Sequence, residues 1–235
     1  MLDIFTASCE NERELRKQAN QIKRLFNDAL RKNRDQDIEA LTKIYALIYS
    51  AYVEVSFLKT IHTPHGFDES YISQIQSARN IEEKWSKCID LAFGRIISGN
   101  NIDEINNKKQ IVNRILREYI IDPSHIRNKI AHGQWKVCLN TDNTAINADL
   151  TNQINQVDFV KIDLYFNIYR LFAQCIEDLI ESPYRAHYRF FYSRIVELQE
   201  YLDRTKNFSI EGKRLILQGS PKSTNCHVLR GNSYE

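Results

Sequence analysis

Apolar side chains recur every three or four residues over most of the chain, which is the spacing of one face of an α-helix. With 7 glycines and 4 prolines, few residues interrupt this pattern. Helices are predicted over residues 8–33, 36–62, 71–98, 103–121, 157–181 and 184–205. A shorter helix is predicted from Asp122, as its cap, to Gly133. The pattern therefore predicts a mostly α-helical bundle of about five to seven helices.

One region has strand character instead. The segments "QWKVCLN" and "TAINADL" flank "TDN", which is typical of two short strands joined by a turn. We therefore expect a small β-hairpin at about residues 134–150, inserted after the short helix. A single helical domain is expected over residues 1–206, and the polar residues 207–235 are expected to form a flexible tail.

Composition and charge narrow the classes of function. The net charge of +2 over 235 residues gives no global field for nucleic acid, so such a role would depend on a local patch. The five cysteines are scattered without a CxxC pair, which favours reduced thiols in a cytoplasm over disulfides or a zinc ribbon. The N-terminal residues do not have the pattern of a signal peptide.

The most apolar window, "IYALIYSAYVEVSFL", contains Glu54 and is interpreted as a buried helix and not as a membrane span. No phosphate-binding glycine loop and no nucleophile elbow is present. We therefore expect a cytoplasmic protein with no metal site, no cofactor and no membrane contact.

The most distinctive segment is "IRNKIAHGQW", residues 126–135. Arg127 and His132 lie five residues apart, so on a regular helix their side chains point about 140° apart. Pro123 and Gly133 are predicted to start and end this helix, which would be short enough for both side chains to reach one cleft. A histidine can move protons near neutral pH and an arginine can bind phosphate, a pair that suits metal-independent RNA cleavage. The spacing alone, however, favours an ordinary helix end.

The six residues "RNKIAH" favour the RNA-cleavage site over the ordinary helix end, because they resemble a known signature. They are similar to the Arg-x(4–6)-His motif of ribonucleases of the HEPN superfamily, in which a polar residue commonly follows the arginine. The resemblance covers about residues 8–205, but its specificity rests on these six residues and the flanking "HGQW". It implies acid–base catalysis by His132, phosphate binding by Arg127 and an orienting role for Asn128. It also implies a bundle of long helices, with the motif on a late one.

The same resemblance implies how the protein acts. HEPN ribonucleases usually work as homodimers with a composite cleft, and their substrate is RNA. The segment "AHGQWKVCLN" resembles a bacterial subgroup linked to toxin–antitoxin or phage-defence loci, which implies an antitoxin protein as a partner. Some members of the superfamily lack activity and serve as nucleotide-binding or scaffolding modules.

Several other residues are candidates for supporting the motif. The basic residues near it in sequence are Lys108, Lys109, Arg114, Arg117, Lys129 and Lys136. Lys129 and Lys136 are candidate substrate contacts, although a solvated helix face explains the group equally well. Glu54 is a candidate partner of Arg127 inside the bundle or lies at an amphipathic edge. His125 is a spare proton carrier or a surface cap residue.

A second candidate surface lies in "SPYRAHYRFFYSR". Arg185 and Arg189 share a helix face, and Tyr184, Tyr188 and Tyr192 repeat at the same spacing. Such a face suits single-stranded RNA, although an aromatic stripe is more often packed in a core or a dimer contact.

Three hypotheses follow from these features. The first is a metal-independent endoribonuclease, a homodimeric toxin or phage-defence effector. The second is a non-catalytic module that uses the same cleft for a nucleotide or RNA. The third is a helical scaffold in which Arg127 and His132 are both buried and paired.

Overall fold

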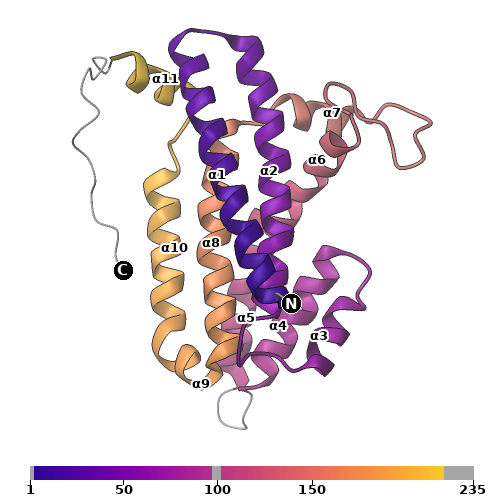
Figure 1. Ribbon diagram of the computed structural model, residues 1–235, viewed down its shortest axis with the longest axis vertical. Helices are drawn as coiled ribbons and strands as arrows, with labels where there is room; N and C mark the ends of the chain where they lie inside the picture. Colours follow the sequence, from indigo (N-terminus) through magenta and orange to yellow (C-terminus); the bar gives the residue numbers. More distant parts are fainter. Residues whose placement is uncertain (1–2, 97–101, 220–235) are drawn as a thin grey trace.

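A computed structural model describes residues 3–96 and 102–219 of the chain, and these form a helical bundle (Figure 1). Its α-helices are α1 (Ile4–Arg31), α2 (Asp35–Ile61), α3 (Glu69–Gln76), α4 (Ile81–Gly94), α5 (Ile102–Leu116), α6 (Asp122–Ala131), α7 (Ala148–Asn155), α8 (Phe159–Glu181), α9 (Pro183–Arg185), α10 (Phe191–Thr205) and α11 (Ile210–Gly219). Two π-helical turns, Arg117–Ile121 and Ala186–Phe190, join α5 to α6 and α9 to α10. The prediction of a mostly α-helical bundle is confirmed.

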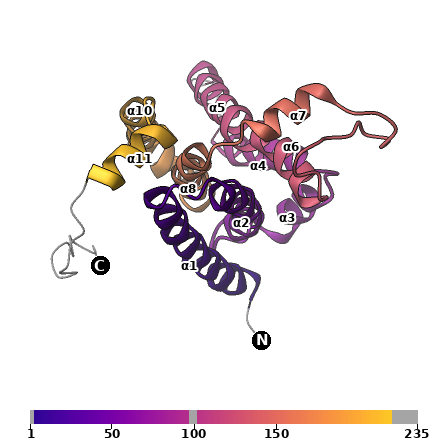
Figure 2. The same ribbon diagram turned by 90° about the horizontal axis from the view of Figure 1, so that it is seen from above.

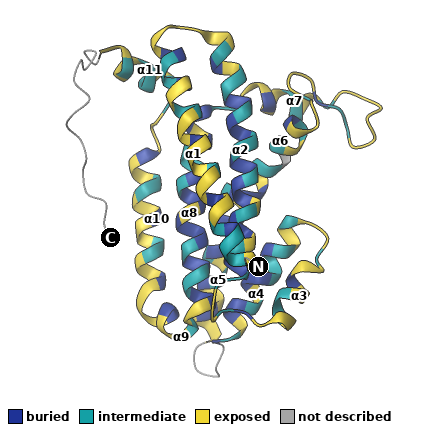
Figure 3. Cartoon of the chain, viewed as in Figure 1, coloured by how far each residue is buried: buried dark blue, intermediate teal, exposed yellow. Residues whose placement is uncertain are grey.

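Helices α2 and α8 form the centre of the bundle. Seen from above, α8 lies among α1, α2, α5 and α10 (Figure 2). Buried residues follow both α2 and α8 along most of their length (Figure 3). The ring of Phe159 on α8 stacks on Phe26 of α1 and on Tyr45 of α2, with ring centroids 3.7 and 4.2 Å apart. Aromatic packing therefore ties the first two helices to the central one.

Helix α2 also has the length and composition of a membrane-spanning helix, with a mean hydropathy of 1.2 over its most apolar window. Of that window, 56% is buried inside the bundle, as expected for the core helix of a globular domain. The interpretation of this segment as a buried helix is consistent with its burial, because many of its apolar side chains belong to the hydrophobic core.

The helix predicted over residues 71–98 is two helices, α3 and α4, separated by a turn; residues 97 and 98 lie outside the described part of the chain. Side chains compete with the helical hydrogen bonds at this turn. The Ser77 hydroxyl donates to the carbonyl of Gln74 at 2.8 Å. The side chain of Asn80 caps α4 by accepting a hydrogen bond from the N–H of Glu83 at 2.9 Å.

The predicted β-hairpin at 134–150 is absent from the structure, and this prediction was wrong. In that segment the described residues form a loop with one isolated antiparallel bridge, between Leu139 and Ile146, followed by α7. Side chains take up two backbone donors of a longer ladder, because the N–H of Cys138 donates to Thr151 Oγ1 (2.9 Å) and that of Ala145 to Asn140 Oδ1 (3.3 Å). Ile146 is 67% exposed, so its side of the bridge does not pack against the hydrophobic core, and an isolated pair of strands is only marginally stable.

Part of the expected C-terminal tail is helical. Residues 210–219 form α11, and Arg214 pairs with Asp35 at the start of α2, with Nη2 and Oδ1 3.0 Å apart. The side chain of Gln218 donates to the Asn33 side-chain oxygen at 3.0 Å. These contacts attach α11 to the α1–α2 connection, and residues 220–235 of the predicted tail lie outside the described part.

Candidate functional site

The motif lies at the end of one continuous helical run. Helix α5, the π-helical turn and α6 follow one another from residue 102 to 131, and Asp122, predicted as a cap, has helical dihedral angles (φ −56°, ψ −46°). Pro123 has no N–H to donate to the carbonyl of Tyr119, four residues earlier. The hydroxyl of Tyr49 on α2 donates to that carbonyl at 3.1 Å instead. The predicted short helix is therefore present as α6, but it continues from the π-helical turn without a break, so the prediction that Asp122 caps it was wrong.

The C-terminal end of α6 is closed at Gly133, as predicted. Gly133 has φ +78°, a conformation that glycine adopts without strain. Its N–H donates to the carbonyl of Ile130 (3.0 Å), and the N–H of Gln134 donates to that of Lys129 (2.9 Å), which is the hydrogen-bond pattern of a Schellman motif. His132 is the C-cap residue of this turn and is exposed. An imidazole at this place is open to solvent and to a second molecule.

Arg127 points the other way, into the bundle. Its Nη1 donates to the carboxylate of Glu54 at 2.6 Å and also to the hydroxyl of Ser50, both on α2. The Arg127 side chain is 14% exposed and that of Glu54 is 58% exposed. The buried Nε of Arg127 has no hydrogen-bond partner among the described residues. The predicted pairing of Glu54 with Arg127 is confirmed, and the two motif side chains lie in different environments.

The remaining residues of the motif region differ in how they are placed. Asn128 follows Arg127 and is exposed. The side chain of His125 lies outside the described part of the structure. Because His132 is exposed, the condition of the scaffold hypothesis, two inward-facing and paired side chains, is not met.

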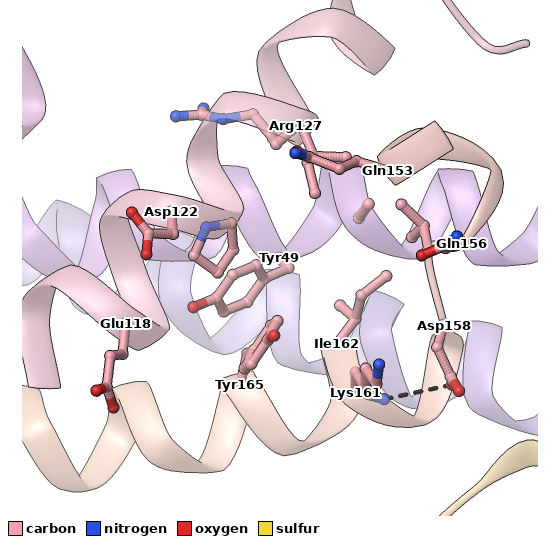
Figure 4. A pocket seen from close by; sticks show the side chains of 14 residues that line it. Tyr49, Glu118, Asp122, Arg127, Gln153, Gln156, Asp158, Lys161, Ile162 and Tyr165 are labelled. Carbon is pink, nitrogen blue, oxygen red and sulfur yellow. Dashed lines mark hydrogen bonds between the residues drawn. The ribbon is translucent and has the colours of Figure 1, made fainter. Parts of the chain in front are cut away.

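A pocket of about 290 Å³ opens beside Arg127 (Figure 4). Four parts of the bundle enclose it: α2, the run from the π-helical turn into α6, the end of α7, and the start of α8. Its lining residues are Ala46, Tyr49, Glu118, Asp122, Pro123, Ile126, Arg127, Gln153, Gln156, Val157, Asp158, Lys161, Ile162 and Tyr165. Arg127 is on the wall of this pocket, and His132 is not.

The lysines near the motif lie in different environments. The ammonium of Lys129 donates to the carbonyl of Leu139 at 2.7 Å and anchors the loop after α6. Lys109 pairs with Asp90 at 2.7 Å. Lys136 is exposed on the loop. Of the two lysines predicted to contact substrate, Lys129 therefore has a structural partner and Lys136 faces solvent.

Lys108 is buried and belongs to a separate cluster under α10. Its ammonium donates to the carbonyl of His187 at 2.9 Å and pairs with Glu104 at 2.7 Å. His187 is fully buried, and its Nε2 has no hydrogen-bond partner among the described residues. Burial, and secondly the charge of Lys108, lower the pKa of the His187 imidazole. This cluster stabilises the π-helical turn Ala186–Phe190 and is separate from the motif.

Arg185 and Arg189 are both exposed and, with Tyr184 and Tyr188, line a shallow surface hollow. Tyr184 and Tyr188 are 65% and 64% exposed, so in the single chain this aromatic stripe is on the surface and not in the core. Helix α9 lies at the opposite end of the bundle from α6 (Figure 1). The structure therefore does not bring Arg185 and Arg189 together with Arg127 and His132.

Comparisons with known proteins found no match to a protein-family model, a curated protein or a solved structure. Among the described residues, no group of three or more His, Cys, Asp or Glu side chains is arranged to hold a metal ion. The described cysteines, Cys9, Cys88, Cys138 and Cys175, are free, and Cys226 lies outside the described part. The site is thus defined by its own geometry: an exposed imidazole at a helix end, and a paired guanidinium at the wall of a pocket.

Proposed function

We propose that this protein is a metal-independent endoribonuclease, in line with the resemblance of "RNKIAH" to the motif of HEPN ribonucleases. The observation that carries the proposal is the position of His132, which is exposed at the glycine-closed end of the same helix that presents Arg127 to a pocket. An exposed imidazole is accessible to a phosphodiester, and a guanidinium is the side chain best suited to bind one.

The reaction that these groups suit is an internal transesterification. A base removes the proton from a ribose 2′-hydroxyl, and the 2′-oxygen forms a bond to the adjacent phosphorus. The bond from phosphorus to the 5′-oxygen breaks, and an acid gives that oxygen a proton. The products are a 2′,3′-cyclic phosphate and a 5′-hydroxyl. Arg127 would stabilise the extra negative charge on the phosphorane, His132 would move the proton, and Asn128 would orient the phosphate or the imidazole.

A homodimer would complete this site. One histidine cannot act as base and acid in the same step, and in one chain His132 is absent from the pocket that Arg127 lines. Two copies related by a two-fold axis, with the ends of their α6 helices facing each other, would supply two histidines to one cleft. His125 would then be a spare proton carrier at the same helix.

RNA binding has to compete with an interaction that already exists. The Arg127 guanidinium is paired with Glu54 at 2.6 Å, so a phosphate must share or replace that carboxylate. Lys136, on the exposed loop after the motif, and Lys129, at its base, would contact the RNA backbone near the cut. Arg185 and Arg189, at the far end of the bundle, would hold a more distant part of a single strand by charge and by stacking on Tyr184 and Tyr188.

In the cell, we infer that such an enzyme acts in the cytoplasm as a toxin or a phage-defence effector that an antitoxin protein restrains. The sequence "AHGQWKVCLN", which resembles a subgroup of that kind, supports this part of the proposal.

The second candidate function is a non-catalytic module that binds a nucleotide or RNA. The buried state of Arg127 favours it, because a guanidinium with 14% exposure and two partners on α2 is less available to a scissile phosphate than a free one. In this case the ion pair with Glu54 would stabilise the wall of the binding pocket.

Cleavage of a labelled single-stranded RNA in EDTA separates the two functions. The proposal expects the wild-type protein to cut it and His132→Ala and Arg127→Ala to lose cutting while keeping a wild-type circular dichroism spectrum. His62→Ala, on another helix end, is the matched control and should cut normally. No cutting by the folded, dimeric wild-type protein, together with RNA binding that His132→Ala retains, would reject the ribonuclease in favour of the binding module.

A further inference from the structure

The pocket beside Arg127 has an aromatic wall with hydrogen-bonding groups on both sides of it. Figure 4 shows Tyr49 and Tyr165 between two carboxylates, Glu118 and Asp122, on one side and the carboxamides of Gln153 and Gln156 on the other. The pocket volume of about 290 Å³ is near the lower end of the range for small-molecule sites, ~300–1,000 Å³. Its size and walls therefore suit a small planar group with polar edges.

The aromatic wall can stack a flat ring. Tyr49 is buried, and its hydroxyl donates a hydrogen bond to the carbonyl of Tyr119. Tyr49 therefore contributes its ring to the pocket wall, and its oxygen is not available to a ligand. Tyr165 is half-buried, and its ring lies 6.2 Å from that of Tyr49. Burial is the main reason that the pKa of the Tyr165 phenol is raised, so the hydroxyl stays protonated. Pro123, Ile126 and other apolar residues complete this wall.

Carboxylates outnumber cationic side chains on the wall of the pocket. Three carboxylates line it, from Glu118, Asp122 and Asp158, against Arg127 and Lys161. The carboxylate of Asp158 is the N-cap of α8: its Oδ1 accepts hydrogen bonds from the N–H groups of Val160 (2.6 Å) and Lys161 (3.4 Å), so it is less available to a ligand. Glu118 and Asp122 are exposed and lie one helical turn apart. A ligand in this pocket should therefore present N–H donors to the side where these two carboxylates lie.

We propose that this pocket binds the guanine base of a nucleotide next to the scissile phosphate. Guanine has N–H donors on one edge, at N1 and the exocyclic N2, and the acceptors O6 and N7 along the other. The donors would face Asp122 and Glu118, the acceptors would face the amide groups of Gln153 and Gln156, and the ring would stack on Tyr165. Placed there, the base brings its own phosphate to Arg127; only this last step rests on the proposed ribonuclease function.

Binding of nucleosides, which carry no phosphate, tests the pocket separately from catalysis. Guanosine, inosine, adenosine and uridine are titrated into the full-length protein and followed by isothermal titration calorimetry. Guanosine should bind about tenfold tighter than adenosine or uridine, and inosine, which lacks the N2 amino group, should be intermediate. Asp122→Asn should remove most of this preference, and Tyr165→Leu should weaken all four nucleosides.

Two variants make the outcome decisive. Asp149→Asn, an exposed carboxylate on α7 outside the pocket, should leave the preference unchanged, and so should His132→Ala. Guanosine binding with no RNA cleavage would reject the ribonuclease but support the pocket. Cleavage without guanosine binding, or a preference that Asp122→Asn leaves intact, would overturn the pocket and leave the ribonuclease standing.

Discussion

The ion pair between Arg127 and Glu54 predicts an unusual effect of the substitution Glu54→Gln. The amide keeps the shape of the side chain and can still accept a hydrogen bond from Arg127, but it removes the carboxylate that lies 2.6 Å from Nη1. Exposed pairs contribute about 0.2–1 kcal/mol, and breaking a buried pair costs about 3–5 kcal/mol. Since Glu54 is 58% exposed and Arg127 14% exposed, we expect a loss of about 1 kcal/mol and a Tm lower by about 2–4 °C.

The same substitution should strengthen RNA binding. If Glu54 competes with a phosphate for Arg127, removing about 1 kcal/mol of competition tightens binding about fivefold. The assay is fluorescence anisotropy of a labelled single-stranded RNA. The salt concentration is held at about 0.1 M for all variants, because salt screens contacts between charged groups and would otherwise change the affinity by itself. It is performed in the His132→Ala background, so that cleavage does not consume the RNA.

The charge-matched control is Glu14→Gln. Glu14 is exposed on α1 and pairs with Lys17 at 3.1 Å, so this change alters the net charge equally without touching Arg127. Equal gains in RNA affinity for both variants would show a non-specific charge effect. Weaker binding by Glu54→Gln would show that Glu54 orients Arg127, and either result would refute the competition argument.

Other positions give simpler tests of the structure. Gly133→Ala should cost about 1–2 kcal/mol in thermal unfolding, because φ is +78° with open space around it, whereas Gly94→Ala, in a helix with similar space, should be neutral or stabilising by up to about 1 kcal/mol. Phe159→Ala should lower the urea-unfolding free energy by about 3–5 kcal/mol, and Phe208→Ala, 55% exposed, should change it little. The pKa of His187 is lowered in the folded state, so the imidazole of the unfolded chain takes up a proton first, near pH 6.5. Stability should therefore fall as the pH decreases below about 7. In a series of thermal melts at different pH, His187→Gln should remove part of that fall. Equal melting of the two glycine variants, equal urea unfolding of the two phenylalanine variants, or an unchanged pH profile for His187→Gln would contradict the corresponding argument.

The periodicity of apolar residues was sufficient to predict the long helices. The segments 36–62 and 157–181 were placed within two residues of α2 and α8, because both have continuous apolar faces and clear ends. Local side-chain chemistry explains where the prediction was wrong. Asn80 caps a new helix within an apolar pattern, and the side chains of Thr151 and Asn140 take two of the backbone donors that a longer β-hairpin would need.

The site was less predictable than the fold. The sequence suggested that Glu54 pairs with Arg127, since an unpaired carboxylate in an apolar helix is costly. It gave no signal for Ser50, whose contact with Arg127 depends on how α2 and α6 pack. Pro123 lies in the first turn of α6, as predicted, but the sequence gave no signal that the helical run continues through it. That continuity depends on the Tyr49 hydroxyl of α2, which donates to the carbonyl that Pro123 leaves without a donor.

The chemistry of the RNA ends tests the ribonuclease proposal most directly. The wild-type protein is incubated in EDTA with an RNA and with a copy that carries a 2′-deoxyribose at the cut site, and the products are identified by mass spectrometry. The proposal predicts 2′,3′-cyclic phosphate and 5′-hydroxyl ends, no cutting of the deoxy-substituted copy, and no product with His132→Ala. Products that end in a 3′-hydroxyl and a 5′-phosphate, or cleavage that persists in His132→Ala, would contradict it.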